Sequence, residues 1–132
     1  MEYLIGLALS LAVAGFAIIV GFDRERAFYP TVSIVIASYY VLFAAMAGSA
    51  RTLAFEIAFA SAFLLLAIAG YKKNLWLVAL AIAGHGIFDL AHPYLFGNPG
   101  VPRWWPGFCS AFDVVLGCLV AARLMKTAIA PR

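Results

Sequence analysis

Residues 75–96 read LWLVALAIAGHGIFDLAHPYLF. This run is long enough to cross a bilayer as a helix, which requires about 20 mostly apolar residues. It also carries three ionisable side chains, His85, Asp89 and His92, in an otherwise apolar stretch. Ionisable residues inside a membrane span are costly and by default mark a function. The same run therefore predicts the fold class and indicates where a site should lie.

Four further apolar segments of similar length accompany this run, at about residues 3–22, 28–48, 52–70 and 106–125. Hydrophobic residues make up 66% of the 132-residue chain and charged residues 11%, whereas a soluble domain is about half apolar and about a quarter charged. So small a chain has too much surface to hide these side chains from water. We expect one all-α domain over residues 1–132, a polytopic membrane protein with five transmembrane helices that contacts membrane lipid and no nucleic acid.

The basic residues predict the orientation of this bundle. Seven of them fall on one side of the expected membrane: Arg24, Arg26, Lys72, Lys73, Arg123, Lys126 and Arg132. Only Arg51 and Arg103 fall on the other side. Because basic residues are enriched in cytoplasmic loops, we expect the N-terminus outside and the C-terminus in the cytoplasm.

The ionisable residues of residues 75–96 lie on one helix face. His85, Asp89 and His92 are spaced i, i+4, i+7, so that their side chains fall within roughly 60° of one another around a helix. Asp113 lies about seven residues into the last span, and Glu56 lies near the start of the third. The expected topology places Asp113 at a similar depth to Asp89 and Glu56 slightly nearer the outer face. We therefore expect a polar pocket that opens toward the outer face.

This set of side chains suits a divalent metal ion. Histidine and carboxylate are ligands for Zn²⁺, and a carboxylate-rich set also suits Mn²⁺ or Fe²⁺. We expect His85, Asp89, His92 and Asp113 to be the ligands, with Zn²⁺ as the first choice of metal. An open coordination position would generate hydroxide from a bound water. Glu56 or Asp113 would then act as the catalytic base.

Three further residues are expected to line the substrate pocket: Tyr40, Cys109 and Arg103. Arg103 belongs to the Gly- and Pro-rich connection from Gly97 to Trp105, which cannot continue a helix and would cover the site. Its guanidinium is suited to a phosphate or carboxylate head group. Packing is the plainer interpretation of Tyr40, and a small buried residue that of Cys109.

The run GFDRERAFYP, residues 21–30, together with the His85, Asp89 and His92 stretch, resembles small bacterial polytopic membrane proteins of an uncharacterised family. That resemblance implies the bacterial inner (cytoplasmic) membrane. More loosely, intramembrane His and Asp on neighbouring helices resemble the alkaline-ceramidase-type membrane hydrolases, whose zinc is held by three histidines. The chain departs from that pattern with two histidines, five expected spans instead of seven and no counterpart of the serine.

Three functions stay open from the sequence. The first is a metal-dependent hydrolase of a lipid-like substrate, and the second is an ion or proton-linked transport protein, for which so small a chain would have to form a homo-oligomer. The third is a structural or accessory membrane subunit, in which the polar residues only join helices. In that last case His92 would cap a helix end, and Glu56 would pair with Arg51.

Overall fold

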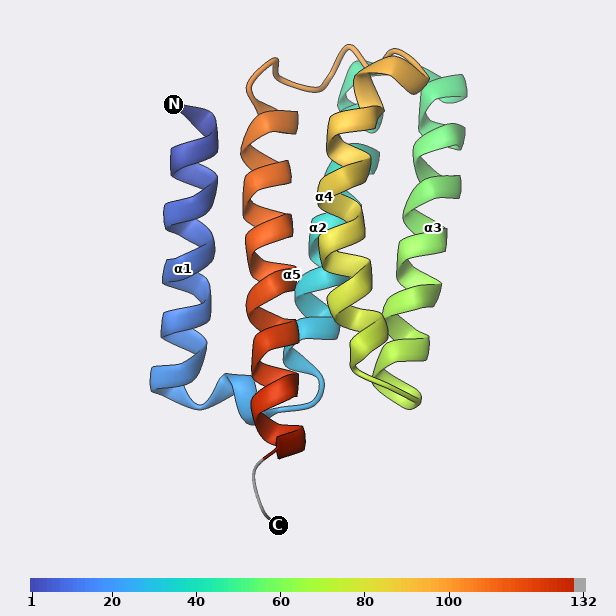
Figure 1. Cartoon of the computed structure of the whole chain (residues 1–132). Coiled ribbons are helices and arrows are strands. Elements are labelled where there is room, and N and C mark those ends of the chain that lie inside the picture. Colours follow the sequence, from blue (N-terminus) through green and yellow to red (C-terminus); the bar gives the residue numbers. More distant parts are fainter. Residues whose placement is uncertain (130–132) are drawn as a thin grey trace.

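The structure is a computed structural model that describes residues 1–129. Five helices cover most of this range (Figure 1). They are α1 (Glu2–Val20), α2 (Phe28–Ala47), α3 (Ala50–Lys72), α4 (Trp76–Leu95) and α5 (Trp105–Ile129), with a short 3₁₀ turn, η1 (Phe22–Arg24), after α1. The predicted all-α fold is confirmed.

Four of the helices, α1, α2, α3 and α5, are long and apolar enough to cross a membrane. Four of the five predicted spanning helices thus have the length and hydropathy that a membrane span requires. The exception is α4, which has 20 residues but carries His85, Asp89, His92 and Pro93, and these lower its mean hydropathy. The helix that holds the polar stripe is therefore the one of the five described helices whose length and hydropathy do not by themselves indicate a membrane span.

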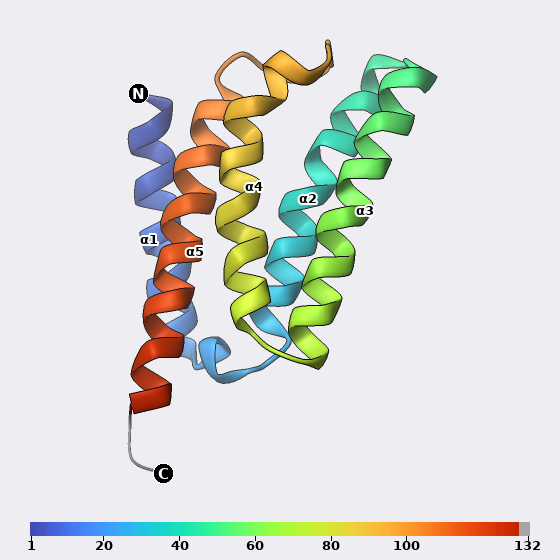
Figure 2. The ribbon, with the colours of Figure 1, turned by 45° about the vertical axis from the view of Figure 1, so that its right-hand side comes forward.

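Helix α4 lies in the middle of the bundle (Figures 1 and 2). It packs against α5 on one side and α3 on the other, while α1 packs on the far side of α5 and α2 packs on α3. The sequence left this order of helices open. Its consequence is that each side of α4 faces a different helix, so that residues along its polar stripe meet different partners.

Glycines allow α4 and α5 to approach closely. A Cβ atom added at Gly117 would lie 2.6 Å from the Ala83 Cβ atom, and one added at Gly86 would lie 2.7 Å from the Val114 Cγ2 atom. No side chain fits at either position without a shift of the neighbouring helix. Small residues at such crossings let membrane helices pack backbone to backbone. The contact fixes the relative position of the two helices that carry most of the polar residues.

Ion pairs and hydrogen bonds close one end of the bundle. The Arg123 side chain lies 2.6 Å from the Asp23 carboxylate, which joins the first connection to α5. Arg26 donates a hydrogen bond of 2.6 Å to the Tyr71 carbonyl near the end of α3. The N-terminus of α1 lies at the opposite end (Figure 1). Of the basic residues used to predict orientation, Arg132 lies outside the described residues.

Substitution of Gly117 by alanine is expected to separate α4 from α5. The added methyl group would meet the backbone of Ala83, and such overpacking costs about 1–3 kcal/mol. We expect a lower melting temperature for Gly117→Ala, measured by differential scanning fluorimetry in detergent. Gly84→Ala is the matched control, because a Cβ atom there meets nothing within 4 Å in the described chain. Equal melting temperatures of the two variants would contradict the close contact.

Candidate metal centre

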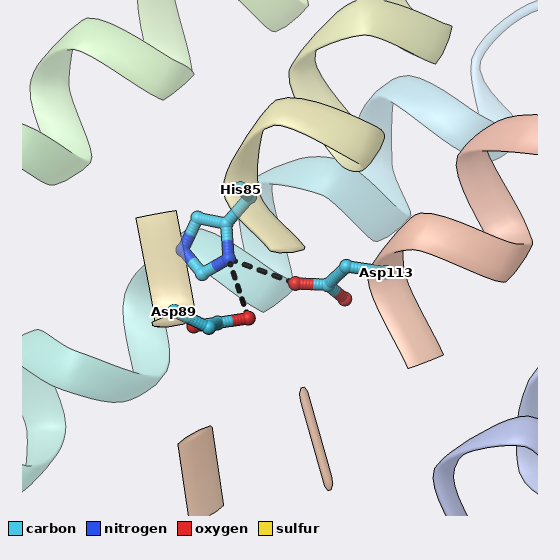
Figure 3. A group of neighbouring side chains, drawn as sticks. All are labelled: His85, Asp89 and Asp113. Atoms are coloured by element: carbon cyan, nitrogen blue, oxygen red, sulfur yellow. Dashed lines mark hydrogen bonds and ion pairs between the residues drawn. The ribbon is translucent and has the colours of Figure 1, made fainter. Parts of the chain in front are cut away.

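Three buried residues from two helices form the centre of the site: His85 and Asp89 of α4, and Asp113 of α5 (Figure 3). The His85 Nδ1 atom lies 2.8 Å from Asp113 Oδ2 and 3.6 Å from Asp89 Oδ2. Candidate ligand atoms of all three residues lie within 4.8 Å of one another. The spacing is therefore suited to one shared ion or to shared protons.

Local geometry explains how the three side chains meet. His85 and Asp89 are four residues apart, so they lie one turn apart on the same face of α4. Gly86 follows His85 directly and lets Val114, the neighbour of Asp113, approach the backbone of α4. The glycine contact between the helices thus places Asp113 opposite the His85 ring.

Several carboxylate oxygens of this centre lack a hydrogen bond, although Asp89 Oδ2 makes an ion-pair contact with His85. Within residues 1–129, Asp89 Oδ1, Asp89 Oδ2 and Asp113 Oδ1 are buried and make no hydrogen bond. Two carboxyl groups share the single imidazole of His85. A buried polar group without a partner is costly, and an unbalanced charge is more so. The arrangement therefore suits a bound cation or added protons, either of which would satisfy these oxygens.

His92 forms a separate pair with another helix. Its Nε2 atom lies 2.6 Å from Glu56 Oε1 of α3. Asn98, in the connection after α4, donates a hydrogen bond of 2.8 Å to the same Glu56 oxygen and one of 3.2 Å to the Tyr40 carbonyl. The alternative pairing of Glu56 with Arg51 is not found in the described residues. The Arg51 guanidinium lies instead over the Phe55 ring, 5.8 Å from its centre.

The Tyr40 ring lies between the two polar groups. It stacks on the His92 ring with 4.0 Å between centroids, and its centroid lies 6.0 Å from that of His85. Of the four residues predicted as metal ligands, the structure therefore brings His85, Asp89 and Asp113 together and pairs His92 with Glu56. Sequence reasoning missed Asn98, whose position in a Gly- and Pro-rich connection gave no signal of burial or contact.

The remaining predicted residues lie on two different sides of the site. Arg103 is exposed and lines a cavity of about 330 Å³ together with His92 and Asn98, at the loop end of α4. Cys109 is buried and lines a groove on the α1 side together with Asp113. Of the three residues of the centre, Asp113 thus lines the mostly apolar groove, while the cavity at the loop end is lined by His92, Asn98 and Arg103 among mainly apolar residues.

No protein-family model, curated protein or solved structure matches this chain. The resemblance to small bacterial membrane proteins, and the looser one to alkaline-ceramidase-type hydrolases, stay predictions. The functional argument therefore starts from the geometry of His85, Asp89 and Asp113.

Asn98→Ala is expected to release the connection after α4. The variant loses the hydrogen bonds to Glu56 and to the Tyr40 carbonyl, each worth about 0.5–1.5 kcal/mol, while Glu56 Oε1 keeps its contact with His92. We expect a lower melting temperature and faster proteolysis between residues 97 and 104. The conservative variant Asn98→Gln, which keeps the amide, should recover part of the loss. Unchanged stability and proteolysis in Asn98→Ala would show that these hydrogen bonds do not hold the connection.

Proposed function

We propose that this protein is an integral membrane metalloenzyme in which His85, Asp89 and Asp113 bind one divalent cation. The supporting observation is the set of three buried carboxylate oxygens around the His85 ring that make no hydrogen bond in the described residues, of which only Asp89 Oδ2 has an ion-pair contact, with His85. Two carboxylates and one imidazole form a mixed nitrogen and oxygen site, which suits Zn²⁺ and also Mn²⁺ or Fe²⁺. His92 belongs to the neighbouring pair with Glu56 and is not needed as a ligand.

The proposed reaction is hydrolysis of a lipid-like substrate. A divalent cation held by three protein ligands keeps a coordination position for water and generates hydroxide at neutral pH. Glu56, paired with His92, is assigned the role of accepting a proton, because its Oε2 atom is buried and makes no hydrogen bond in the described residues. Arg103, which lines the cavity beside His92, would attract an anionic part of the substrate.

We place the protein in the bacterial inner membrane, with α4 as the fifth spanning helix. The proposed orientation has the N-terminus outside and the C-terminus in the cytoplasm, because basic residues such as Arg26, Lys73 and Arg123 gather at the end where α1 ends. The connection after α4, which carries Arg103, lies at the opposite end. In this orientation the cavity lined by His92, Asn98 and Arg103 opens to the outer side of the membrane.

Proton-linked transport is the second candidate, because two carboxylates that share an imidazole are able to hold and release protons. A path across the membrane would have to continue beyond His85 toward the other end. The side chains in that direction are those of a buried apolar cluster that includes Val78, Ile82, Leu116 and Val120. This apolar layer favours a site that is reached from one end, and hence a binding or catalytic role over conduction.

Metal content tests the proposal directly. We expect about one Zn²⁺, Mn²⁺ or Fe²⁺ per purified chain by inductively coupled plasma mass spectrometry, as three ligands from one chain imply. Asp89→Asn, which removes a charge at nearly constant volume, should reduce the metal to background. Glu56→Gln, outside the ligand set, should keep the metal and lose hydrolysis of lipid esters or amides. A wild-type protein that binds no metal even after addition of Zn²⁺ or Mn²⁺ would refute the metalloenzyme.

A flux measurement in proteoliposomes distinguishes proton-linked transport from hydrolysis. We expect no proton or cation flux above that of empty vesicles, because the apolar layer closes the bundle beyond the site. A pH-sensitive dye inside the vesicles measures this flux. Flux that is present in the wild type and lost in Asp89→Asn would favour transport over hydrolysis.

A further inference from the structure

A second, partly enclosed cavity lies at the end of the bundle where α1 ends. Its volume is about 220 Å³, and its lining comes from the connection after α1, the start of α4 and the last turns of α5. The connection passes beside the end of α5 there (Figure 1). On the side of the bundle the lining consists of apolar core residues: Leu75, Val78, Val120 and Leu124. None of the residues of the candidate metal centre lines this cavity.

Three arginines line the cavity, and two of them are held in place by other groups of the protein. The Arg123 side chain, which is 36% exposed, lies 2.6 Å from the carboxylate of Asp23, whose side chain is 2% exposed. Arg26 donates a hydrogen bond of 2.6 Å to the Tyr71 carbonyl. Because a guanidinium has five N–H donors, both arginines keep donors for a ligand. The third, Arg24, is exposed and forms no ion pair within residues 1–129.

The charge of the lining favours an anion. Its three arginines exceed its two acidic residues, Asp23 and Glu25, by one positive charge. Lys72, Lys73 and Lys126, at the same end of the bundle, add to the positive potential. Guanidinium groups bind phosphate through paired N–H donors. A phosphodiester carries one negative charge, which balances the excess charge of the lining.

The position of the cavity favours a phosphate that belongs to a lipid. Helices long and apolar enough to cross a membrane surround it, and the cavity lies at their ends, where lipid headgroups would be. Basic pockets between transmembrane helices are known to take anionic lipid headgroups. A lipid phosphate is also held at this level by its acyl chains, which raises its effective concentration beside the arginines. A phosphate free in water has no such advantage.

We propose that the cavity lined by Arg24, Arg26 and Arg123 binds the phosphodiester headgroup of an anionic phospholipid. Such a headgroup contacts both the first connection and α5, so that its binding joins the two segments and stabilises the bundle at this end. The proposal does not rest on the metal centre or on hydrolysis. It assigns a lipid site to the end of the bundle opposite the connection that carries Arg103.

Native mass spectrometry tests this binding. The probes are phosphatidylglycerol, phosphatidylethanolamine and phosphatidylcholine of the same acyl chains, each added to the purified protein in detergent. We expect the protein to retain phosphatidylglycerol in preference to the other two lipids, and excess inorganic phosphate not to displace it. Equal retention of the three lipids would overturn the proposal. Displacement by inorganic phosphate would show a site for free phosphate and would overturn the assignment to a lipid.

A pair of matched variants distinguishes a defined site from the general positive charge of this end. We expect Arg24→Gln to reduce retention of phosphatidylglycerol about fivefold, the effect of one basic residue beside an anionic lipid. Lys73→Gln removes the same charge at the same end but outside the lining, and should have little effect. Unchanged retention in a folded Arg24→Gln variant, or an equal loss in Lys73→Gln, would overturn the proposal.

Thermal stability gives a second measurement. We expect phosphatidylglycerol to raise the melting temperature of the wild type more than that of Arg24→Gln, because ligand binding to the folded state stabilises it. An equal rise in both proteins would contradict the site. Asp89→Asn should keep the full lipid effect, since Asp89 lies outside this lining. Selective lipid binding by a wild-type protein that binds no metal would refute the metalloenzyme and support the lipid site.

Discussion

The close contact between α4 and α5 determines how the rest of the bundle is built. Gly86 and Gly117 bring the two backbones together, and the 2.8 Å contact between His85 and Asp113 lies at the same interface. Buried ionisable groups are stable only when another group balances them. The glycines make that balance possible because a bulkier interface would hold Asp113 away from the imidazole. The outer helices then pack around this pair, with α1 against α5 and α3 against α4.

The two ends of the bundle differ in chemistry, and the site depends on that difference. Toward the end where α1 stops, the interior is filled by apolar side chains such as Val78, Ile82 and Leu116. Toward the other end, His92, Asn98 and Arg103 line a cavity, while the groove beside Asp113 opens sideways. The polar groups therefore lie nearer one end of the bundle, and the apolar layer separates them from the other end. That arrangement suits a site reached from one side better than an ion path that crosses from side to side.

Apolar length and helical spacing sufficed to predict the helices and the polar stripe, because both are local properties of the chain. The order of helices around α4 depends on packing between distant segments, which one sequence does not reveal. For that reason the sequence predicted His92 as a ligand together with His85 and Asp89. The structure instead pairs His92 with Glu56 of α3, because the polar stripe turns slightly around α4 along its length. Asn98 was missed because a Gly- and Pro-rich connection shows no periodicity that would indicate burial.

A bound metal ion and added protons would both neutralise the same set of atoms. Two ionised carboxylates and a neutral imidazole carry a charge of −2, so one divalent cation makes the group of His85, Asp89 and Asp113 neutral, as do two added protons. A metal ion and added protons differ in the number of polar atoms that each can pair with. Each proton serves one oxygen, or is shared by two, whereas a cation is able to contact both carboxylates and the ring together. Three carboxylate oxygens make no hydrogen bond in the described chain, and ligand atoms of all three residues lie within 4.8 Å of one another. This clustering of several acceptors around one point is the reason for preferring the cation in the proposal.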